Sequence, residues 1–343
     1  MNQTELATQL QHAGIVDQTT AGQLQYSASP WWLQILLAVA AWIASVLIIG
    51  SFVGPVLALA DHNAVRAVIA VLLISAAIWL AAKPQEFLQQ MSVAIALAGQ
   101  GMLVYISYDL FNDEVARYSC AVVAVLLLFS PLKPLHQRLS ISIALACLLS
   151  LISSAAVLAV SGILLAAAAL LLWCNRVKWA GLHYGQTIKS LLDVVTLAAL
   201  LLAISGQSLY WFDSQLWFDT STAYAVTFYS TSGAALFMLT VFWLSRQATV
   251  PSRVALLSLA LLLSVVLYSA SGLLVSTALM LVCFYGCSRL WYAVCLLSML
   301  VSISQFYYSL NITLLHKAGI LALSGLALLS VWLLLQRYQR RLV

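Results

Sequence analysis

Residues 140–173 read SISIALACLLSLISSAAVLAVSGILLAAAALLLW, and no charged side chain interrupts this run. A second uncharged run of the same length covers 254–287. A continuous helix over either run would be about 51 Å long, whereas the hydrocarbon core of a bilayer is about 30 Å thick. Each run therefore has to turn, and each carries small polar residues near its middle, at Ser153-Ser154 and at Ser269–Gly272. We predict two helices joined by a turn in each run.

The rest of the chain has the same character. Of its 343 residues, 64% are hydrophobic and 7% are charged, whereas a soluble globular chain carries about 25% charged residues. A chain of this composition cannot cover a surface that faces water. This excludes a soluble enzyme, a nucleic-acid-binding protein and a secreted disulfide-linked scaffold. The sequence predicts an all-α, polytopic transmembrane helical bundle whose partner is the lipid bilayer.

We predict about twelve spans, within a range of ten to twelve. They form one polytopic transmembrane domain over 31–343, and residues 1–30 form a small cytoplasmic helical appendage before it. The expected spans are 33–59, 64–82, 88–108, 116–132, 139–153, 156–173, 190–209, 223–244, 254–269, 272–287, 290–308 and 314–335.

The distribution of basic residues predicts the orientation, because Lys and Arg collect in cytoplasmic loops. With twelve spans, only Arg66, Arg117 and Lys317 of the fifteen Lys and Arg residues fall on the side opposite the N-terminus. Both termini are therefore predicted to be cytoplasmic. Merging 140–173 into one span still splits the basic residues eleven to four. Charge alone therefore does not decide the number of spans, and the length of that run does.

Two features suggest a repeat of four-helix units. The hairpins 139–173 and 254–287 both follow an arginine, Arg138 or Arg253, and both turn at small residues. In addition, the spans 88–108, 190–209 and 290–308 each contain a glutamine followed by aromatic residues. The alternative is chance similarity between segments built from Leu, Ala, Val and Ser.

These glutamines, Gln100, Gln207 and Gln305, form the best candidate for a ligand site. Aromatic residues follow them at Tyr108, Trp211 and Tyr308. Buried amides need hydrogen-bond partners, and amides beside aromatic rings suit a sugar, a peptide or a lipid head group. The simpler alternative is that the amides bond to neighbouring helices.

Two further features are candidates for ion coupling and for a partner. Asp193 lies about one turn inside the span 190–209 and is the candidate coupling-ion or proton site; the alternative is a carboxylate at an interfacial helix start. The loop 210–222 repeats Trp-Phe-Asp and contains no basic residue. It is the candidate docking site for a membrane protein partner, and an aromatic belt at the membrane surface is the alternative.

Motifs for metal, nucleotide or nucleophilic chemistry are missing from the sequence. We therefore expect no catalytic residues, no metal site, no cofactor and no nucleic-acid partner. Cys283 and Cys287 are four residues apart, so they are expected on one helix face, as small buried side chains.

The sequence contains FLQQ at 87–90, ALAGQ at 96–100 and YYSLNITLL at 307–315, followed by Lys317. These stretches resemble a family of uncharacterised bacterial inner-membrane proteins, the domain-of-unknown-function family 4401. The segment around Gly14-Ile15-Val16 is similar to the start of the related family 2157. The resemblance implies a multi-pass protein of the inner membrane, and it brings no activity and no catalytic residue.

The leading hypothesis for function is a permease-like protein that handles a small molecule or a lipid component. The first alternative is a non-transporting membrane scaffold or partner subunit. A weaker alternative is a lipid-linked transferase, although the sequence favours a protein that is not an enzyme.

Overall fold

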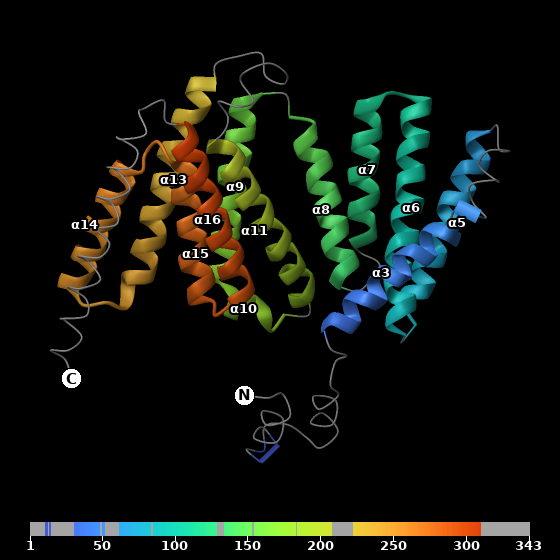
Figure 1. Ribbon diagram of the computed structural model, residues 1–343, viewed down its shortest axis with the longest axis horizontal. Coiled ribbons are helices and arrows are strands. Elements are labelled where there is room, and N and C mark those ends of the chain that lie inside the picture. Colours follow the sequence, from blue (N-terminus) through green and yellow to red (C-terminus); the bar gives the residue numbers. More distant parts are fainter. Residues whose placement is uncertain are drawn as a thin grey trace. The chain divides into compact units, whose positions relative to one another are not determined.

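The computed structural model describes residues 11–12, 14, 31–48, 50–51, 62–83, 85–128, 134–152, 154–182, 184–207 and 222–309. These ranges are almost entirely helical and contain no strand. The helices, shown in Figure 1, are α3 Trp31–Ile48, α5 Asn63–Ala81, α6 Glu86–Leu110, α7 Asp113–Leu128, α8 Pro134–Ser150, α9 Ala155–Cys174, α10 Arg176–Ala180, α11 Gly185–Gln207, α13 Thr222–Leu244, the short 3-10 helix η2 Ser245–Gln247, α14 Val250–Val266, α15 Ser271–Tyr285 and α16 Arg289–Ser309.

The expected spans between residues 64 and 308 each coincide with one of these helices. The number of spans, their orientation and the four-helix repeat stay predictions. The expected span 314–335 and nearly all of the appendage 1–30 lie outside the described residues. Within the described ranges, six helical segments are long and apolar enough to cross a membrane: Asn63–Ala81, Phe87–Leu110, Ala155–Cys174, Gly185–Ser205, Tyr224–Gln247 and Arg289–Tyr307.

Both long uncharged runs are divided into two helices, as the sequence predicts. In the first run α8 ends at Ser150 and α9 begins at Ala155. In the second run α14 ends at Val266 and α15 begins at Ser271. The second break is a tight local turn, because the Ala270 N–H donates to the Leu267 carbonyl at 2.8 Å. The expectation of two helices in each run is confirmed.

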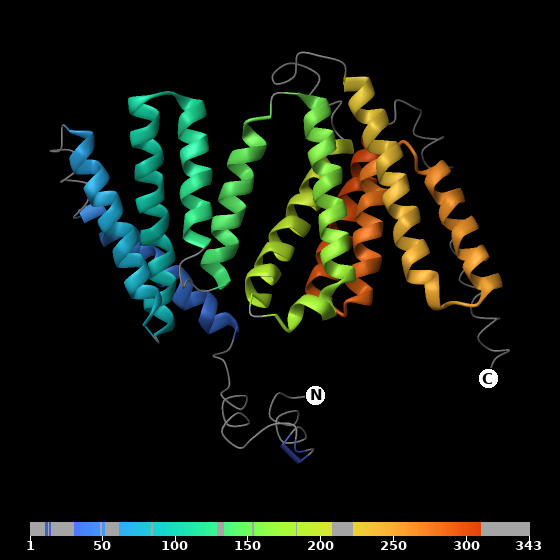
Figure 2. The ribbon, with the colours of Figure 1, turned by 180° about the vertical axis from the view of Figure 1, so that it is seen from behind.

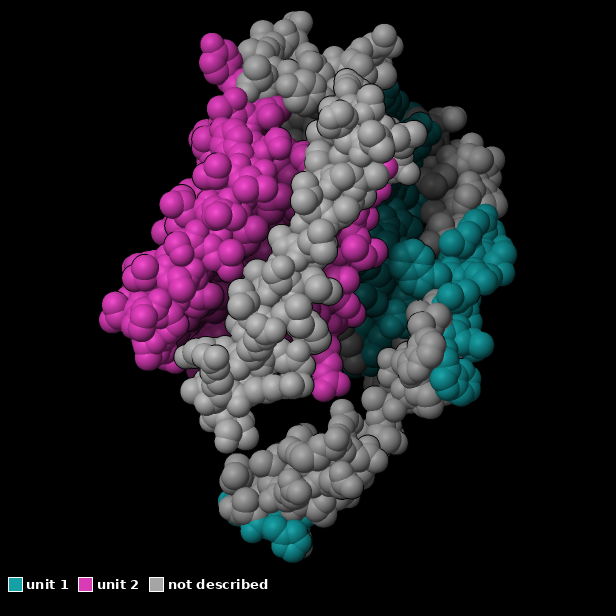
Figure 3. Space-filling model, turned by 60° about the vertical axis from the view of Figure 1, so that its left-hand side comes forward, with its two compact units in different colours: residues 1–147 teal, residues 148–343 magenta. Residues whose placement is uncertain are grey.

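The chain divides into two compact units, Met1–Cys147 and Leu148–Val343 (Figure 3). The boundary falls near the end of α8. Helices α3, α5, α6 and α7 belong to unit 1, and the helices from α9 to α16 belong to unit 2.

In unit 1, helix α6 packs against α3, α5 and α7. Gly99 permits the close approach of α6 to α5, since a Cβ there would lie 2.8 Å from Ile74 Cγ1 and 3.0 Å from the Ala70 carbonyl oxygen. The ends of the two helices are also joined, because Asn63 Nδ2 donates to Asp109 Oδ2 at 2.8 Å. Figure 2 shows α5 and α6 side by side from behind.

In unit 2, helix α15 forms the centre and packs against α9, α11, α13 and α16. Most of its fifteen residues are buried. Small residues on several sides of α15, including Ser271, Gly272, Ser276 and Ala278, allow four neighbours to approach closely. A helix that is apolar all round is expected at such a buried position.

The outward faces of the helices are apolar. Leu164 and Leu171 on α9 are 63% and 64% exposed, and most of α14 is exposed with its Leu and Val side chains. Soluble proteins rarely expose apolar surface on this scale to water. The described helices therefore present the kind of surface that lipid chains cover.

Candidate functional site

Unit 2 has a basic end. Its described Lys and Arg residues all lie in or next to the turns around α10, between α13 and α14, and between α15 and α16, which Figure 1 shows at the bottom of this unit. We call this the basic end, and the opposite end, where α11 and α16 finish, the far end. The residues are Arg176, Lys178, Lys189, Arg246, Arg253 and Arg289.

A line of polar and aromatic side chains runs along α16 from the basic end towards the far end. It consists of Trp291, Cys295, Ser298, Ser302 and Gln305, which we call the α16 stripe. Alternating steps of four and three residues place these side chains on one helix face. From first to last the stripe rises about 21 Å, which is most of the about 30 Å of a bilayer's hydrocarbon core.

The first three members of the stripe have partners on neighbouring helices. Trp291 Nε1 donates to Asp193 Oδ1 of α11 at 2.8 Å. The thiols of Cys295 and Cys283 of α15 are 3.9 Å apart, and both are fully buried. Next along the stripe, the hydroxyls of Ser298 and Ser276 share a buried hydrogen bond of 2.9 Å.

The last two members lack such partners. Ser302 is completely buried, and its hydroxyl has no hydrogen-bond partner among the described residues. Gln305 is half-buried, and its Oε1 is buried without a partner. The far half of the α16 stripe therefore offers a donor–acceptor hydroxyl and a carbonyl acceptor that the described helices do not use.

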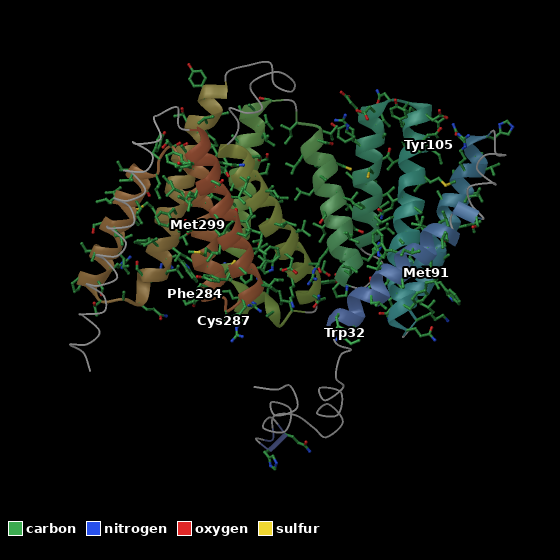
Figure 4. The ribbon with its side chains drawn as sticks, viewed as in Figure 1. Trp32, Met91, Tyr105, Phe284, Cys287 and Met299 are labelled. Carbon is green, nitrogen blue, oxygen red and sulfur yellow. The ribbon has the colours of Figure 1, made fainter. Side chains whose placement is uncertain are left out.

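Two other contacts define the surroundings of the stripe. Met299, which Figure 4 labels, follows Ser298 on α16, and its sulfur accepts a hydrogen bond of 3.6 Å from the Thr277 hydroxyl of α15. Tyr229 of α13 is buried against Gly162 of α9, where a Cβ would lie 3.1 Å from its ring. In the described part of unit 2, the Tyr229 hydroxyl is a third buried side-chain oxygen without a hydrogen-bond partner.

Asp193 is the one carboxylate among the residues described in unit 2. It is half-buried on α11 at the basic end, and the Trp291 indole holds it. One turn further along α11, Thr196 accepts a hydrogen bond of 3.1 Å from Trp173 Nε1 of α9. Helix α11 is thus joined to α16 through the Asp193 carboxyl group and to α9 through the Thr196 hydroxyl.

The three predicted glutamines lie in different environments. Gln100, on α6 of unit 1, is 4% exposed, and both its Nε2 and its Oε1 lack partners. Gln305 lies at the far end of unit 2, and Gln207 ends α11 at that same end, although its side chain is outside the described residues. Within the described ranges, neither Gln100 nor Gln305 makes the bond between helices that the structural alternative required.

The aromatic residues predicted beside these amides add little to the described site. Tyr108 is exposed near the end of α6. Tyr308 belongs to α16, but its side chain is outside the described residues, as is Trp211. The proposed docking loop 210–222 is also outside them, apart from the first helical residue, Thr222.

The expected stacking of Cys283 and Cys287 on one helix face is wrong. Helix α15 ends at Tyr285, and Cys287 has a positive φ of 53° in the turn that follows. The Ser288 N–H donates to the Cys283 carbonyl at 3.1 Å, which is the hydrogen bond of a Schellman motif. The neighbour of Cys283 is instead Cys295 of α16, and no group of three or more metal-binding side chains occurs among the described residues.

Sequence reasoning identified only the last residue of the α16 stripe. The 4-3-4-3 spacing of 291, 295, 298, 302 and 305 was visible in the sequence. Ser and Cys pack in membrane helices as small residues, so this spacing carried little weight without the partners on α11 and α15.

Comparison with known proteins identifies one family. A family model described as "Domain of unknown function (DUF4401)" matches residues 30–338. Among curated proteins nothing matches the chain, and among solved structures nothing matches it either. The matched range begins after Gly14-Ile15-Val16, so the similarity of that segment to family 2157 stays a prediction.

Proposed function

The chain belongs to the DUF4401 family, and from this premise we propose that it is an integral membrane protein with a permease-like function. The proposed cargo is a small molecule, or a lipid component, that offers hydrogen-bonding groups. The α16 stripe is its proposed contact surface in unit 2.

The unpartnered oxygens of Ser302 and Gln305 carry this proposal. A buried polar group that lacks a hydrogen bond costs about 1–3 kcal/mol. Polar residues that join helices would be paired, as Ser298 and Ser276 are. A ligand that hydrogen-bonds to the far half of the stripe accounts for the difference, and Gln100 has the same property in unit 1.

Asp193 is the proposed coupling site for a proton or a cation. Ionisable residues within membrane helices are costly and are usually retained for function. Its hydrogen bond to Trp291 links a change of charge on α11 directly to the first member of the stripe.

The proposed location is the bacterial inner membrane, with the basic end of unit 2 facing the cytoplasm. The clustering of the unit's described Lys and Arg residues at that end supports this orientation. The far half of the α16 stripe would then open towards the periplasmic side.

The test compares the small molecules and lipids that co-purify with the wild type and with the double variant Ser302→Ala/Gln305→Leu. We expect a defined molecule to accompany the wild type in stoichiometric amount and to fall at least about tenfold in the variant, as the loss of two hydrogen bonds implies. The molecule is then tested for uptake by the protein reconstituted in vesicles.

The matched control is Ser258→Ala/Gln247→Leu, which makes the same two changes at exposed positions of unit 2. Equal amounts of the molecule in all three proteins would contradict the proposal. A stoichiometric protein partner with no bound small molecule would favour the scaffold hypothesis, with the loop 210–222 as the first docking surface to examine.

A further inference from the structure

Two guanidinium groups share one aromatic ring at the corner between α13 and α14. The Cζ of Arg253 lies 4.5 Å from the centroid of the Phe242 ring, and the Cζ of Arg246 lies 5.7 Å from it. Arg246 belongs to η2 and Arg253 to the first turns of α14. Phe242 is 39% exposed, so this corner lies at the surface of unit 2.

Among the residues that the structure describes in unit 2, no carboxylate neutralises the charges at this corner. Asp193, the one carboxylate described in unit 2, is held by Trp291 on α16, and neither of these residues belongs to the corner. Because both guanidinium carbons lie within 5.7 Å of one ring centroid, they are at most about 10 Å apart, and like charges at about this distance still repel each other at an ionic strength of 0.1 M. An anion bound between them would remove this repulsion.

The start of α14 adds to the same positive field. Thr249 is the N-cap, and its side chain makes no capping bond to the helix backbone. It is hydrogen-bonded to the Ser252 hydroxyl instead. The positive end of the helix dipole therefore lies beside Arg253, and such helix starts favour negative groups.

Aromatic rings lie at the same end of unit 2 as the corner. Trp243 of α13 contacts Tyr285 of α15 edge to face at 5.4 Å, and Phe284 lies 5.9 Å from Tyr292. Figure 4 labels Phe284 at this end of unit 2. Aromatic residues gather where hydrocarbon meets head groups.

Beyond Arg253, the exposed surface of α14 becomes apolar. Val254, Leu261 and Val265 are all exposed along this helix. A molecule with a negatively charged head group and hydrocarbon chains fits these two adjoining surfaces. Its head group would contact the arginines, and its chains would lie along the exposed apolar side chains of α14.

We propose that the corner formed by Phe242, Arg246 and Arg253 binds the headgroup phosphate of an anionic phospholipid. Basic pockets on the cytoplasmic side of membrane helices bind such head groups. The inference does not depend on the proposed permease function.

Other arginines of unit 2 provide a contrast. The Arg176 guanidinium also lies over a ring, 5.6 Å from the centroid of Trp173, but it donates to the Gly286 carbonyl at 2.6 Å and so joins α10 to the end of α15. Arg289 is exposed at the basic end and shares no ring with a second cation among the described residues. Arg289 and Lys178, both exposed, therefore provide matched control positions.

The test measures the melting temperature of the full chain in uncharged detergent during titration with phosphatidylglycerol, phosphatidylcholine or inorganic phosphate. We expect only phosphatidylglycerol to raise the Tm of the wild type. In Arg246→Gln/Arg253→Gln, half-maximal stabilisation should need at least about tenfold more phosphatidylglycerol, as two lost charge contacts imply. The control Lys178→Gln/Arg289→Gln should respond as the wild type does.

Three results would overturn the proposal. They are an unchanged phosphatidylglycerol response in the corner variant, an equal loss of response in the control, and a full response to inorganic phosphate alone. If the corner variant does not fold, Phe242→Leu keeps both charges but removes the ring that positions them. This variant should also need several-fold more phosphatidylglycerol, and an unchanged response would contradict the proposal.

Discussion

The two halves of the α16 stripe contain similar residues but differ in their partners. Near the basic end, Trp291, Cys295 and Ser298 each meet a polar side chain or a thiol on α11 or α15. Near the far end, the hydroxyl of Ser302 and the Oε1 of Gln305 have no hydrogen-bond partner in the part of the chain that the structure describes. Stability alone explains the paired half, whereas the proposed ligand would account for the buried oxygens of the unpaired half.

The largest effect is expected in the paired half. Trp291→Phe removes the indole N–H that donates a hydrogen bond to Asp193 Oδ1. A hydrogen bond to a charged group contributes about 1.5–3 kcal/mol to stability. We expect the free energy of unfolding in detergent to fall by about that amount. The control is Trp243→Phe at the same end, since the Trp243 ring contacts Tyr285 and Phe preserves that contact. Equal losses in the two variants would show that ring volume, rather than the Asp193 bond, is what matters.

A smaller effect separates the two serines of the stripe. Ser298→Ala leaves the buried Ser276 hydroxyl without its partner, and a hydrogen bond between membrane helices contributes about 0.6 kcal/mol on average. Ser302→Ala removes a hydroxyl that has no partner. We expect the first variant to unfold more easily and the second to match or slightly exceed the wild type. If Ser302→Ala lost as much stability as Ser298→Ala, the claim that only the Ser298 hydroxyl has a partner would be contradicted.

A small effect of the opposite sign is expected in the turn that begins the paired half. Cys287 has a φ of 53°, a conformation that costs a residue with a Cβ about 1–2 kcal/mol and costs glycine far less. Glycine also loses more entropy on folding, so Cys287→Gly should raise the free energy of unfolding by less than about 1 kcal/mol. Ser288→Gly, next to it but without a positive φ, should lower it. A destabilised Cys287→Gly protein would mean that the thiol itself supports the turn.

Much of the helical pattern could be predicted because it depends on local features. The length of an uncharged run and the small polar residues at its middle are enough to require a turn. The breaks before Ala155 and before Ser271 therefore appear where the sequence places them. The end of α15 was harder to predict, since the run continues to Cys287 and no charged residue marks Tyr285 as the last helical residue.

The site was predicted only in part. The glutamines attracted attention as large polar residues within apolar spans, and the burial of Gln100 agrees with that reasoning. The division into two units had no counterpart in the sequence, because apolar composition continues through α8. The pairing of Asp193 with Trp291 joins positions 98 residues apart, and no spacing rule within one helix reaches that far.

By itself, the sequence determined that the chain forms long apolar helices, where several of them break, and which residues inside them are polar. These properties follow from hydrophobicity, helix length and local turn chemistry. Only the tertiary structure decided that Ser298 is paired and that Ser302, one turn away and identical in type, is not. A hydrogen bond needs two groups within about 3 Å of each other, and the packing of α15 against α16 alone decides which serine meets Ser276.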